Sequence, residues 1–393
     1  MKILELVHRF PPSIGGSQST AAHIAWTLGE LGHEVTVVTT TSLNQFDVFG
    51  WTARGWIRRS TYPAQLENEE RSKVRVLRFP PRFQFYTGMW TPALYAWVRK
   101  HKEDFDLIHA HGYTFFEPLY PLLPQRARRP KLVLSGYDLT QPHQSLAARL
   151  ALNLHDRTLG RHMLNSYDAL IALTDANVEE YLALGAKREK IHVIPVGVDS
   201  AQFAGNSAAR RADQLELLFI GRLVEYKGAQ YAIQALKKIL KKRPKARLTI
   251  VGEDQGYQST LEVQVSKEKL GQAVTFAGKV SDEMLVKYCQ SAHFLVFPSL
   301  NEGFGIVVLQ AIAGGCYPIL ADRKSLRYVL RDIGGHPINM DQPEQIGASI
   351  AQAILTLSEK QRVQEVRKMQ KLVREHYAWQ PIAQLLLRVA DLL

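Results

Sequence analysis

Residues 297–311 combine an acid with two glycines at the start of an apolar stretch. The preceding apolar run, 293–297, reads as a buried strand, and the residues that follow the glycines read as a helix. A helix that starts after a strand offers unpaired N–H groups and a positive dipole end to an anion. Gly303 and Gly305 lack side chains and allow a ligand to approach the backbone. This pattern predicts a ligand site that includes Glu302 at the carboxyl end of a strand.

Two cations stand in a similar setting earlier in the chain. Gly221 and Arg222 end the apolar run 216–220, and Lys227 follows five residues after the arginine. An arginine can bind two phosphate oxygens at once, and a lysine supplies a compact positive charge. The pair therefore suits a diphosphate. A solvated loop with two ordinary surface cations is the alternative.

A glycine turn also lies between the first predicted strand, 2–7, and the first predicted helix, 17–31. Gly15 and Gly16 place a flexible backbone at the helix start, where an anion can bind. The turn lacks the glycine spacing of a dinucleotide fold and of a P-loop. A plain turn with Ser17 as the helix N-cap is the alternative.

The composition limits the class of protein. A chain of 393 residues exceeds one typical hydrophobic core, so we expect two domains. Its apolar runs fall short of the ~18 residues that a membrane span needs, and the first residues resemble a strand rather than a signal peptide. The two cysteines, Cys289 and Cys316, form no disulfide or metal pattern, which suits a reducing cytoplasm. The net charge of +12 favours anionic partners.

The order of predicted elements indicates the fold class. Strands and helices alternate up to about residue 199, a polar stretch at 199–214 interrupts them, and the alternation then restarts. From residue 343 onward the pattern is helical. Two βαβ series in succession predict an α/β protein with two doubly wound domains and a cleft between them. The predicted strands are 2–7, 34–39, 73–79, 106–109, 131–134, 169–173, 190–194, 216–220, 247–251, 274–276 and 293–297.

Several motifs in this order resemble the GT4 family of retaining glycosyltransferases. The N-terminal PPSIGG resembles that family's first loop, and IPVGVD at 194–199 resembles its IPNGVD. The segments GRLVEYKG at 221–228 and VGED at 251–254 are similar to its donor-phosphate and VGxG turns. Residues 297–315 resemble its E-x7-E region. The resemblance covers nearly the whole chain.

This resemblance implies the GT-B fold, in which two Rossmann-like domains face a central cleft. It implies an acceptor-side domain at residues 1–199 and a nucleotide-sugar-binding domain at 200–375. The helix at 376–393 is expected to pack back on the first domain.

The resemblance also implies the roles of the site residues. Arg222 and Lys227 are expected on the donor diphosphate, and Glu302 on the sugar hydroxyls. A diphosphate gains negative charge as it leaves, and these cations stabilise that charge in the transition state without a metal. No cofactor is expected besides the nucleoside-diphosphate sugar substrate. The other predicted donor contacts are Gly15, Gly16, Gly221, Glu253, Gly303, Phe304, Gly305, Ile306 and Gln310.

The chain departs from the family pattern at two places. Gln310 replaces the second acid of E-x7-E and loses its charge, which predicts altered contacts with the nucleoside. Ser135 stands where the family often has a histidine that touches the donor sugar. His111 is the nearest candidate to supply an imidazole, and a structural histidine is the alternative. We take His111, Ser135, Gly136 and Asp138 as candidate sugar or acceptor contacts.

These departures support an alternative function, a GT-B protein with altered catalysis that acts as a binding or scaffold subunit. The retention of Arg222, Lys227 and Glu302 favours an enzyme that transfers a sugar to a glycan or lipid-linked acceptor. The pair Asp104 and Asp106 matches the D-x-D of metal-dependent transferases, but it precedes a predicted strand, and we expect no metal.

A mixed aromatic and basic segment could contact a membrane. Its residues are Trp51, Arg54, Trp56, Arg58 and Arg59. Such side chains suit an anionic membrane surface or a lipid-linked acceptor, and a half-buried loop is the alternative. We therefore expect a cytoplasmic protein with a peripheral site at the inner face of the membrane, and no nucleic-acid partner.

Overall fold

The computed structural model describes residues 1–13, 15–43, 50–52, 55–57, 69–71, 73–85, 88–113, 118–119, 129–137, 139, 153, 155–204 and 214–393. The chain forms two compact units. The first unit is Met1–Val196 together with Trp379–Leu393, and the second is Gly197–Ala378. The domain boundaries that we placed after residues 199 and 375 each differ from these limits by three residues.

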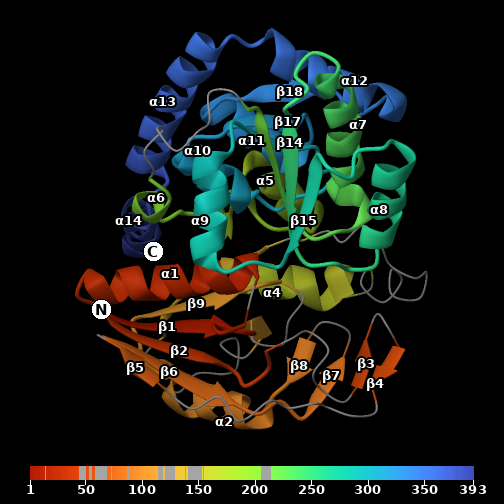
Figure 1. The fold of residues 1–393 in the computed structure, drawn as a ribbon. Coiled ribbons are helices and arrows are strands. Elements are labelled where there is room, and N and C mark those ends of the chain that lie inside the picture. The colour runs from red at the N-terminus through yellow and green to blue at the C-terminus, as the bar shows by residue number, and fades with distance from the viewer. Residues whose placement is uncertain are drawn as a thin grey trace. The chain divides into compact units, whose positions relative to one another are not determined.

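The first unit is built on an eight-stranded sheet (Figure 1). Its strands are β1 (Lys2–Val7), β2 (Glu34–Thr40), β5 (Glu69–Arg71), β6 (Val74–Phe79), β9 (Leu107–His111), β10 (Lys131–Ser135), β11 (Ala169–Ala172) and β12 (Ile191–Val193). The order is β12-β11-β10-β9-β1-β2-β6-β5, and all pairs are parallel except β5 with β6. A small second sheet contains β3 (Gly50–Thr52), β4 (Gly55–Ile57), β7 (Phe83–Phe85) and β8 (Gly88–Trp90).

Helices cover this sheet because its central strands are buried along their whole length. In β1 only Lys2 is exposed, and the apolar side chains on both sides of the strand pack into the core. Helix α14 packs against α1, and Lys131 Nζ donates a hydrogen bond of 2.7 Å to the Ala390 carbonyl. The helical segments are α1 (Gly16–Glu30), α2 (Pro92–His101), η1 (Lys102–Asp104), η3 (Asp156–Gly160), α4 (Arg161–Ser166), α5 (Asp175–Ala183), η4 (Arg188–Lys190) and α14 (Trp379–Asp391).

The second unit is built on a six-stranded, fully parallel sheet. Its strands are β13 (Glu216–Ile220), β14 (Arg247–Val251), β15 (Val274–Gly278), β16 (Phe294–Phe297), β17 (Tyr317–Ala321) and β18 (His336–Ile338), and their order is β15-β14-β13-β16-β17-β18. The helical segments are α6 (Ser200–Phe203), η6 (Glu225–Lys227), α7 (Ala229–Leu240), α8 (Gln258–Lys267), α9 (Asp282–Ser291), α10 (Ile306–Gly314), α11 (Lys324–Asp332), α12 (Pro343–Thr356) and α13 (Glu359–His376).

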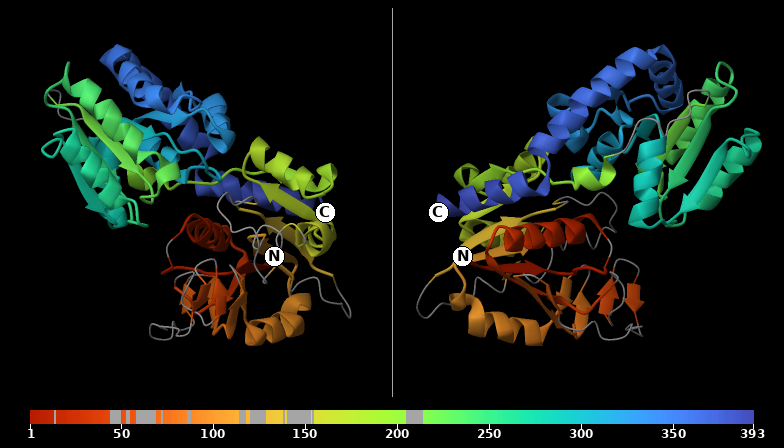
Figure 2. Two further views of the ribbon diagram at one scale, coloured as in Figure 1. Left: turned by 90° about the vertical axis from the view of Figure 1, so that its right-hand side faces the viewer. Right: turned by 60° about the vertical axis from the view of Figure 1, so that its left-hand side comes forward.

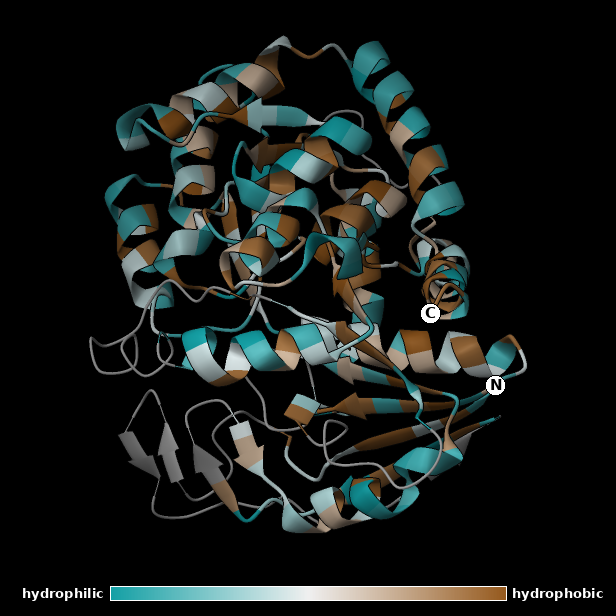
Figure 3. Cartoon of the chain, turned by 180° about the vertical axis from the view of Figure 1, so that it is seen from behind, coloured by the Kyte–Doolittle hydropathy of each residue, from teal (hydrophilic) through white to brown (hydrophobic). Residues whose placement is uncertain are grey.

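Two helical layers enclose this second sheet. Helices α7, α8 and α12 pack together, and α6, α9, α10 and α13 form the other group (Figure 2). Brown, apolar strands lie at the centre of each unit, whereas α13 is polar along much of its length (Figure 3). The two doubly wound parallel units predicted from the alternating pattern are confirmed.

Each parallel sheet has a point at which the strand order reverses. In the first unit β1 lies between β2 and β9, and in the second unit β13 lies between β14 and β16. Ligands of open α/β sheets bind outside the carboxyl ends of the strands at such a point. The loops that follow β13 and β16 are therefore the expected ligand site of the second unit.

Candidate active site

The predicted phosphate-binding arginine lies directly after β13. Arg222 donates hydrogen bonds of 2.9 Å to Tyr226 Oη and 3.3 Å to Gln255 Oε1. Both partners are neutral, so the guanidinium keeps its full positive charge at the carboxyl end of the strand. An anion that binds there gains a charge-assisted hydrogen bond.

Lys227 and Glu302 meet although they are far apart in the sequence. Lys227 Nζ lies 2.5 Å from Glu302 Oε1, and the exposed fractions of the two side chains are 11% and 12%. The lysine ends η6 after β13, and the acid follows β16, so the reversal of strand order joins them. The cation and the acid that the sequence places in one site therefore form one largely buried ion pair.

Glycine at position 228 allows the two loops to approach each other. Gly228 has φ +82°, and a Cβ atom there would lie 2.5 Å from the Pro298 carbonyl oxygen. The Leu300 N–H also donates a 2.9 Å hydrogen bond to the Tyr226 carbonyl. Backbone contacts thus hold the lysine loop against the turn that carries Glu302.

The turn after β16 ends at the start of α10. Gly305 is the N-cap residue of α10 and has φ +90°, a conformation that favours glycine. The first N–H groups of this helix have no partner within the helix, so they can bind a ligand. The Phe304 ring is buried against Tyr328 and Tyr377, which leaves only its backbone for a donor contact.

The remaining predicted donor residues of the second unit lie in the turns after β13, β14 and β16 or on α10. Gly221 follows β13, and its N–H bonds the Val251 carbonyl. Glu253 is exposed in the turn after β14, and Gln310 is half-buried on α10. Gly303 and Ile306 flank the start of the same helix. The roles of these residues in donor binding stay predictions.

The glycine turn of the first unit forms the start of α1. The helix begins at Gly16 with Gly15 as its N-cap residue, so the alternative that placed the N-cap at Ser17 is wrong. The Gln18 side chain lies over the turn, because a Cβ atom on Gly15 would meet Gln18 Oε1 at 2.1 Å. Any donor contact of Gly15 and Gly16 belongs to the first unit.

A buried polar cluster lies at the reversal point of the first sheet. Glu5 on β1 faces His109 and His111 on β9, and all three side chains are at most 1% exposed. His109 Nδ1 lies 3.0 Å and His111 Nε2 lies 2.6 Å from Glu5 Oε2. A carboxylate therefore bridges two imidazole rings in the core.

The electrostatics of the cluster fix the proton positions. Burial raises the pKa of Glu5, but the His109 charge and hydrogen bonds from both rings outweigh it and lower the pKa to about 2. Burial, with repulsion from His109, lowers the pKa of His111 to about 4. Neutral His111 therefore donates from Nε2 to Glu5, and its Nδ1 accepts the Tyr137 hydroxyl proton at 2.8 Å.

The hydrogen bonds of this cluster bear on the candidate substrate contact at His111. Both of its ring nitrogens are bonded inside the protein, because Glu5 lies opposite it on the neighbouring strand. Ser135 is 3% exposed, and its hydroxyl lies 2.8 Å from His109 Nε2. The Gly136 N–H donates to Tyr181 Oη at 2.7 Å. The substrate or acceptor roles of His111, Ser135 and Gly136 stay predictions, and Asp138 lies outside the described residues.

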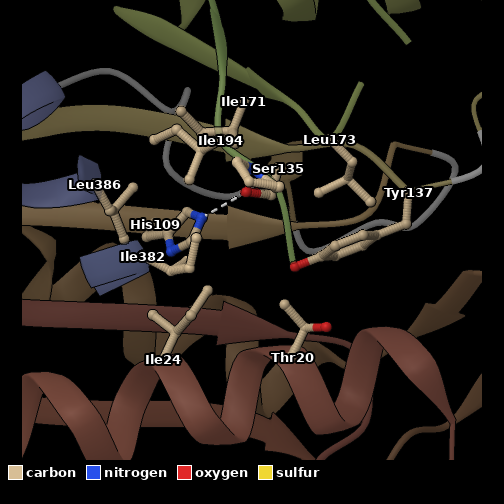
Figure 4. Close-up of a pocket in the computed structure, with 11 residues that line it drawn as sticks. Thr20, Ile24, His109, Ser135, Tyr137, Ile171, Leu173, Ile194, Ile382 and Leu386 are labelled. Atoms are coloured by element: carbon tan, nitrogen blue, oxygen red, sulfur yellow. Dashed lines mark hydrogen bonds between the residues drawn. The ribbon is translucent and has the colours of Figure 1, made fainter. Parts of the chain in front are cut away.

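Ser135 and Tyr137 line a small cavity of the first unit (Figure 4). The other walls come from α1, α14 and the sheet and are mostly apolar, with Ile24, Ile382 and Leu386 among them. The dashed bond in Figure 4 joins His109 to Ser135 beside this cavity. The hydroxyl-bearing residues Ser135 and Tyr137 thus connect the buried cluster to a largely apolar cavity.

The same cluster has the side-chain types of a metal site. The ligand atoms of Glu5, His109 and His111 lie within 4.8 Å of one another. Each of these atoms already makes a hydrogen bond within the cluster. Hydrogen bonding alone therefore explains the arrangement, and the expected independence of a metal stays a prediction.

The cluster predicts that acid destabilises the first unit. The folded pKa values of Glu5 and His111, about 2 and 4, lie below the ordinary 4.5 and 6.5. The unfolded chain therefore binds these protons at higher pH than the folded chain. The free energy of unfolding should fall as the pH drops from 6.5 to 4 because of His111, and from 4.5 to 2 because of Glu5. Calorimetric melting at pH 7.5, 6.5 and 5 measures this, and a His111→Gln variant should lose part of the decline. An identical decline in the wild type and in the His111→Gln variant would show that His111 does not cause it.

The mixed aromatic and basic segment falls largely outside the described residues. Arg54, Arg58 and Arg59 lie outside the described residues. Trp51 and Trp56 lie on strands β3 and β4, for which only the backbone is described. Within the described part of the chain, no helix has the length and hydropathy to cross a bilayer. The membrane contact through this segment stays a prediction.

Comparison with known proteins decides the family. Residues 203–370 match the family described as Glycosyl transferases group 1, and residues 15–197 match the Glycosyl transferase 4-like domain. The chain is 31% identical over 312 residues to phosphatidyl-myo-inositol mannosyltransferase of Mycobacterium tuberculosis, which covers 76% of this chain and 78% of that protein. The chain belongs to the group 1 glycosyltransferases. The predicted family, and the prediction of an enzyme that transfers sugars, are thereby confirmed.

Other glycosyltransferases of known sequence or structure are also similar. GDP-mannose:cellobiosyl-diphosphopolyprenol alpha-mannosyltransferase of Xanthomonas campestris is 26% identical over 323 residues, which is 82% of this chain and 79% of that protein. Sucrose-phosphate synthase of Thermosynechococcus elongatus aligns with a TM-score of 0.74 at 18% identity, covering 100% of this chain and 99% of that one. HepE of Anabaena in complex with UDP and glucose aligns with a TM-score of 0.72 at 19% identity, covering 100% of both chains. The predicted GT-B fold of this glycosyltransferase is confirmed.

Proposed function

We propose that this glycosyltransferase moves a sugar from a nucleoside-diphosphate sugar to an acceptor hydroxyl, with retention of the anomeric configuration and without a bound metal. One observation carries the proposal. Lys227 pairs with Glu302, and Arg222 directly follows β13, at the carboxyl ends of the strands where the order of the second sheet reverses. This is the place at which open α/β sheets bind their ligands.

The chemistry follows from the charge that develops during transfer. When the bond between the sugar and the β-phosphate breaks, the electron pair stays on the phosphate oxygen. Arg222 and Lys227 stabilise this negative charge, and the N–H groups that start α10 add to the effect. Two cations and a helix end supply the charge that a divalent metal supplies elsewhere.

Retention does not require a carboxylate nucleophile in this site. The Glu302 carboxylate is bound to Lys227, which suits an acceptor of sugar hydroxyl protons rather than an attacking group. The acceptor hydroxyl would attack from the face that the diphosphate leaves, and a leaving-phosphate oxygen would take its proton.

The relatives guide the choice of substrates to test. The name of the Xanthomonas relative mentions GDP-mannose and a diphosphopolyprenol-linked acceptor, and that of the Mycobacterium relative mentions phosphatidyl-myo-inositol. The structure of HepE contains UDP and glucose. We infer a uridine or guanosine diphosphate sugar as donor and a glycan or lipid-linked hydroxyl as acceptor. The scaffold alternative is less favoured because Arg222, Lys227 and Glu302 are all present and Lys227 pairs with Glu302.

A binding and turnover panel tests this proposal. A ligand at 100 times its dissociation constant stabilises the folded state by roughly 2.7 kcal/mol, so melting of the protein with UDP, GDP and their sugars should reveal the donor. NMR of the product should show the donor's anomeric configuration, and turnover should persist in EDTA. Absence of both binding and turnover for every donor would favour the scaffold alternative.

Gln310 gives a further prediction about the nucleoside. A carboxylate accepts hydrogen bonds from ribose hydroxyls more strongly than an amide does. Gln310→Glu should therefore lower the dissociation constant for UDP or GDP by about 3- to 10-fold. Calorimetric titration measures the change. An unchanged constant for both nucleotides would place Gln310 away from the ribose.

A further inference from the structure

Lys324 has an unusual backbone conformation beside the candidate active site. It begins α11 in the loop after β17, the strand next to β16, and its φ is +37°. Among the non-glycine residues that the structure describes, only Lys324 and Lys269 have positive φ. A positive φ strains an L-residue because its Cβ atom approaches the following carbonyl oxygen.

The two lysines differ in what the fold requires of them. Lys269 follows the end of α8, where a left-handed residue is a common way to terminate a helix, and its N–H bonds the Ser266 carbonyl at 3.0 Å. Lys324 starts a helix, and no such termination applies there. The fold therefore accounts for the conformation of Lys269 but not for that of Lys324.

The Lys324 side chain extends toward the turn that carries Glu302. Lys324 Nζ donates a 3.1 Å hydrogen bond to Asn301 Oδ1, and the Asn301 carbonyl accepts a 3.4 Å bond from Lys227 Nζ. Lys324, Asn301, Lys227 and Glu302 thus form one continuous polar group at the ends of β13, β16 and β17.

The charge of Lys324 is not neutralised by the protein around it. The neighbouring Arg323 and Arg327 form ion pairs with Asp341 and Asp322. In the described part of the chain, no carboxylate lies within ion-pair distance of the Lys324 ammonium, and its partner Asn301 is neutral.

The diphosphate of a nucleotide sugar carries two negative charges, and Lys324 adds to Arg222 and Lys227 a cation that no carboxylate of the described residues pairs. Lys227 is already paired with Glu302, whereas Arg222 has neutral partners and contributes one full charge. Lys324 contributes the second. The acid Glu253 follows β14, which lies on the other side of β13 in the strand order from β17, the strand before Lys324.

We propose that Lys324 binds the β-phosphate of the donor and that its strained backbone is kept because it places the ammonium there. This inference rests on the proposed function. The β-phosphate is the phosphate bonded to the sugar, so it must lie next to the sugar-binding acid, and Lys324 reaches the residue directly before Glu302. The reaction would thus use three cations, of which the sequence motifs indicate two.

Paired glycine variants test the inference. Lys324→Gly and Lys269→Gly both relieve a left-handed strain, and each should raise the melting temperature by about 2 °C or leave it unchanged. Lys324→Gly should weaken UDP and GDP binding about 10-fold in calorimetric titration and leave UMP and GMP binding within about 2-fold. Lys269→Gly should alter none of these constants, and Lys324→Arg should restore diphosphate binding to within about 3-fold.

The outcomes separate this inference from the proposed function. If Lys324→Gly binds UDP and GDP as the wild type does, or loses mono- and diphosphate binding equally, the β-phosphate contact is overturned. If the wild type binds none of the four nucleotides, the proposed function fails and takes this inference with it.

Discussion

Replacement of Lys227 by alanine should reduce kcat/KM for the donor by about 10²- to 10³-fold, the largest catalytic loss that we expect from one substitution. The lysine stabilises charge that is greater in the transition state than in the bound donor, so kcat should fall more than KM rises. The substitution also leaves the largely buried Glu302 carboxylate without its counter-charge. Steady-state kinetics with the donor identified in the panel measures both constants.

A double-mutant cycle shows whether the pair acts as one unit. Glu302→Ala should also cause a large loss, and Lys227→Ala/Glu302→Ala should lose no more than the worse single variant, because the two side chains are 2.5 Å apart. Lys287→Ala, at an exposed position of α9, is the control and should retain full activity. Additive losses, or full activity of Glu302→Ala, would refute the site assignment.

Replacement of Glu5 by alanine should destabilise the first unit by about 3–5 kcal/mol, the largest structural effect that we expect. The carboxylate is 0% exposed and accepts hydrogen bonds from both His109 and His111. Its removal leaves two buried imidazole N–H groups without an acceptor and opens a space in the core. Urea unfolding followed by fluorescence measures the change.

An exposed acid on the neighbouring strand provides the control. Glu34 begins β2 and is solvent-exposed, so Glu34→Ala should change the free energy of unfolding by at most about 0.5 kcal/mol. Equal stabilities of Glu5→Ala and Glu34→Ala would show that the buried carboxylate does not hold the two strands together.

The fold could be predicted to a large extent because both sheets are parallel and buried. Such strands appear as short apolar runs between helical patterns, and the predicted runs 2–7, 216–220 and 247–251 coincide with β1, β13 and β14. Strand ends were less exact, since β9 extends to His111, two residues beyond the predicted end. The end of a strand depends on its neighbours, which a local pattern does not contain.

The candidate site was predictable where its residues stand in turns that the sequence itself marks. The turns after β13 and β16 have acids, cations and glycines in the sequence, and the reversal of strand order brings them together. Lys324 was missed because it lies in a loop without glycine, and its strained φ appears only in the folded chain.

The buried cluster was missed for a different reason. Glu5 is an acid within an otherwise apolar strand, which is itself a signal of a buried polar partner. That partner is 104 residues away, and only the pairing of β1 with β9 identifies His109. The same pairing places His111 beside the Glu5 carboxylate in the interior.

A crystal structure with bound UDP or GDP tests the central claim most directly. We predict that the β-phosphate lies within about 3.5 Å of the Arg222 guanidinium and the Lys227 ammonium, at the carboxyl ends of β13 and β16. A nucleotide bound elsewhere in the chain, with no phosphate at these two cations, would contradict the claim.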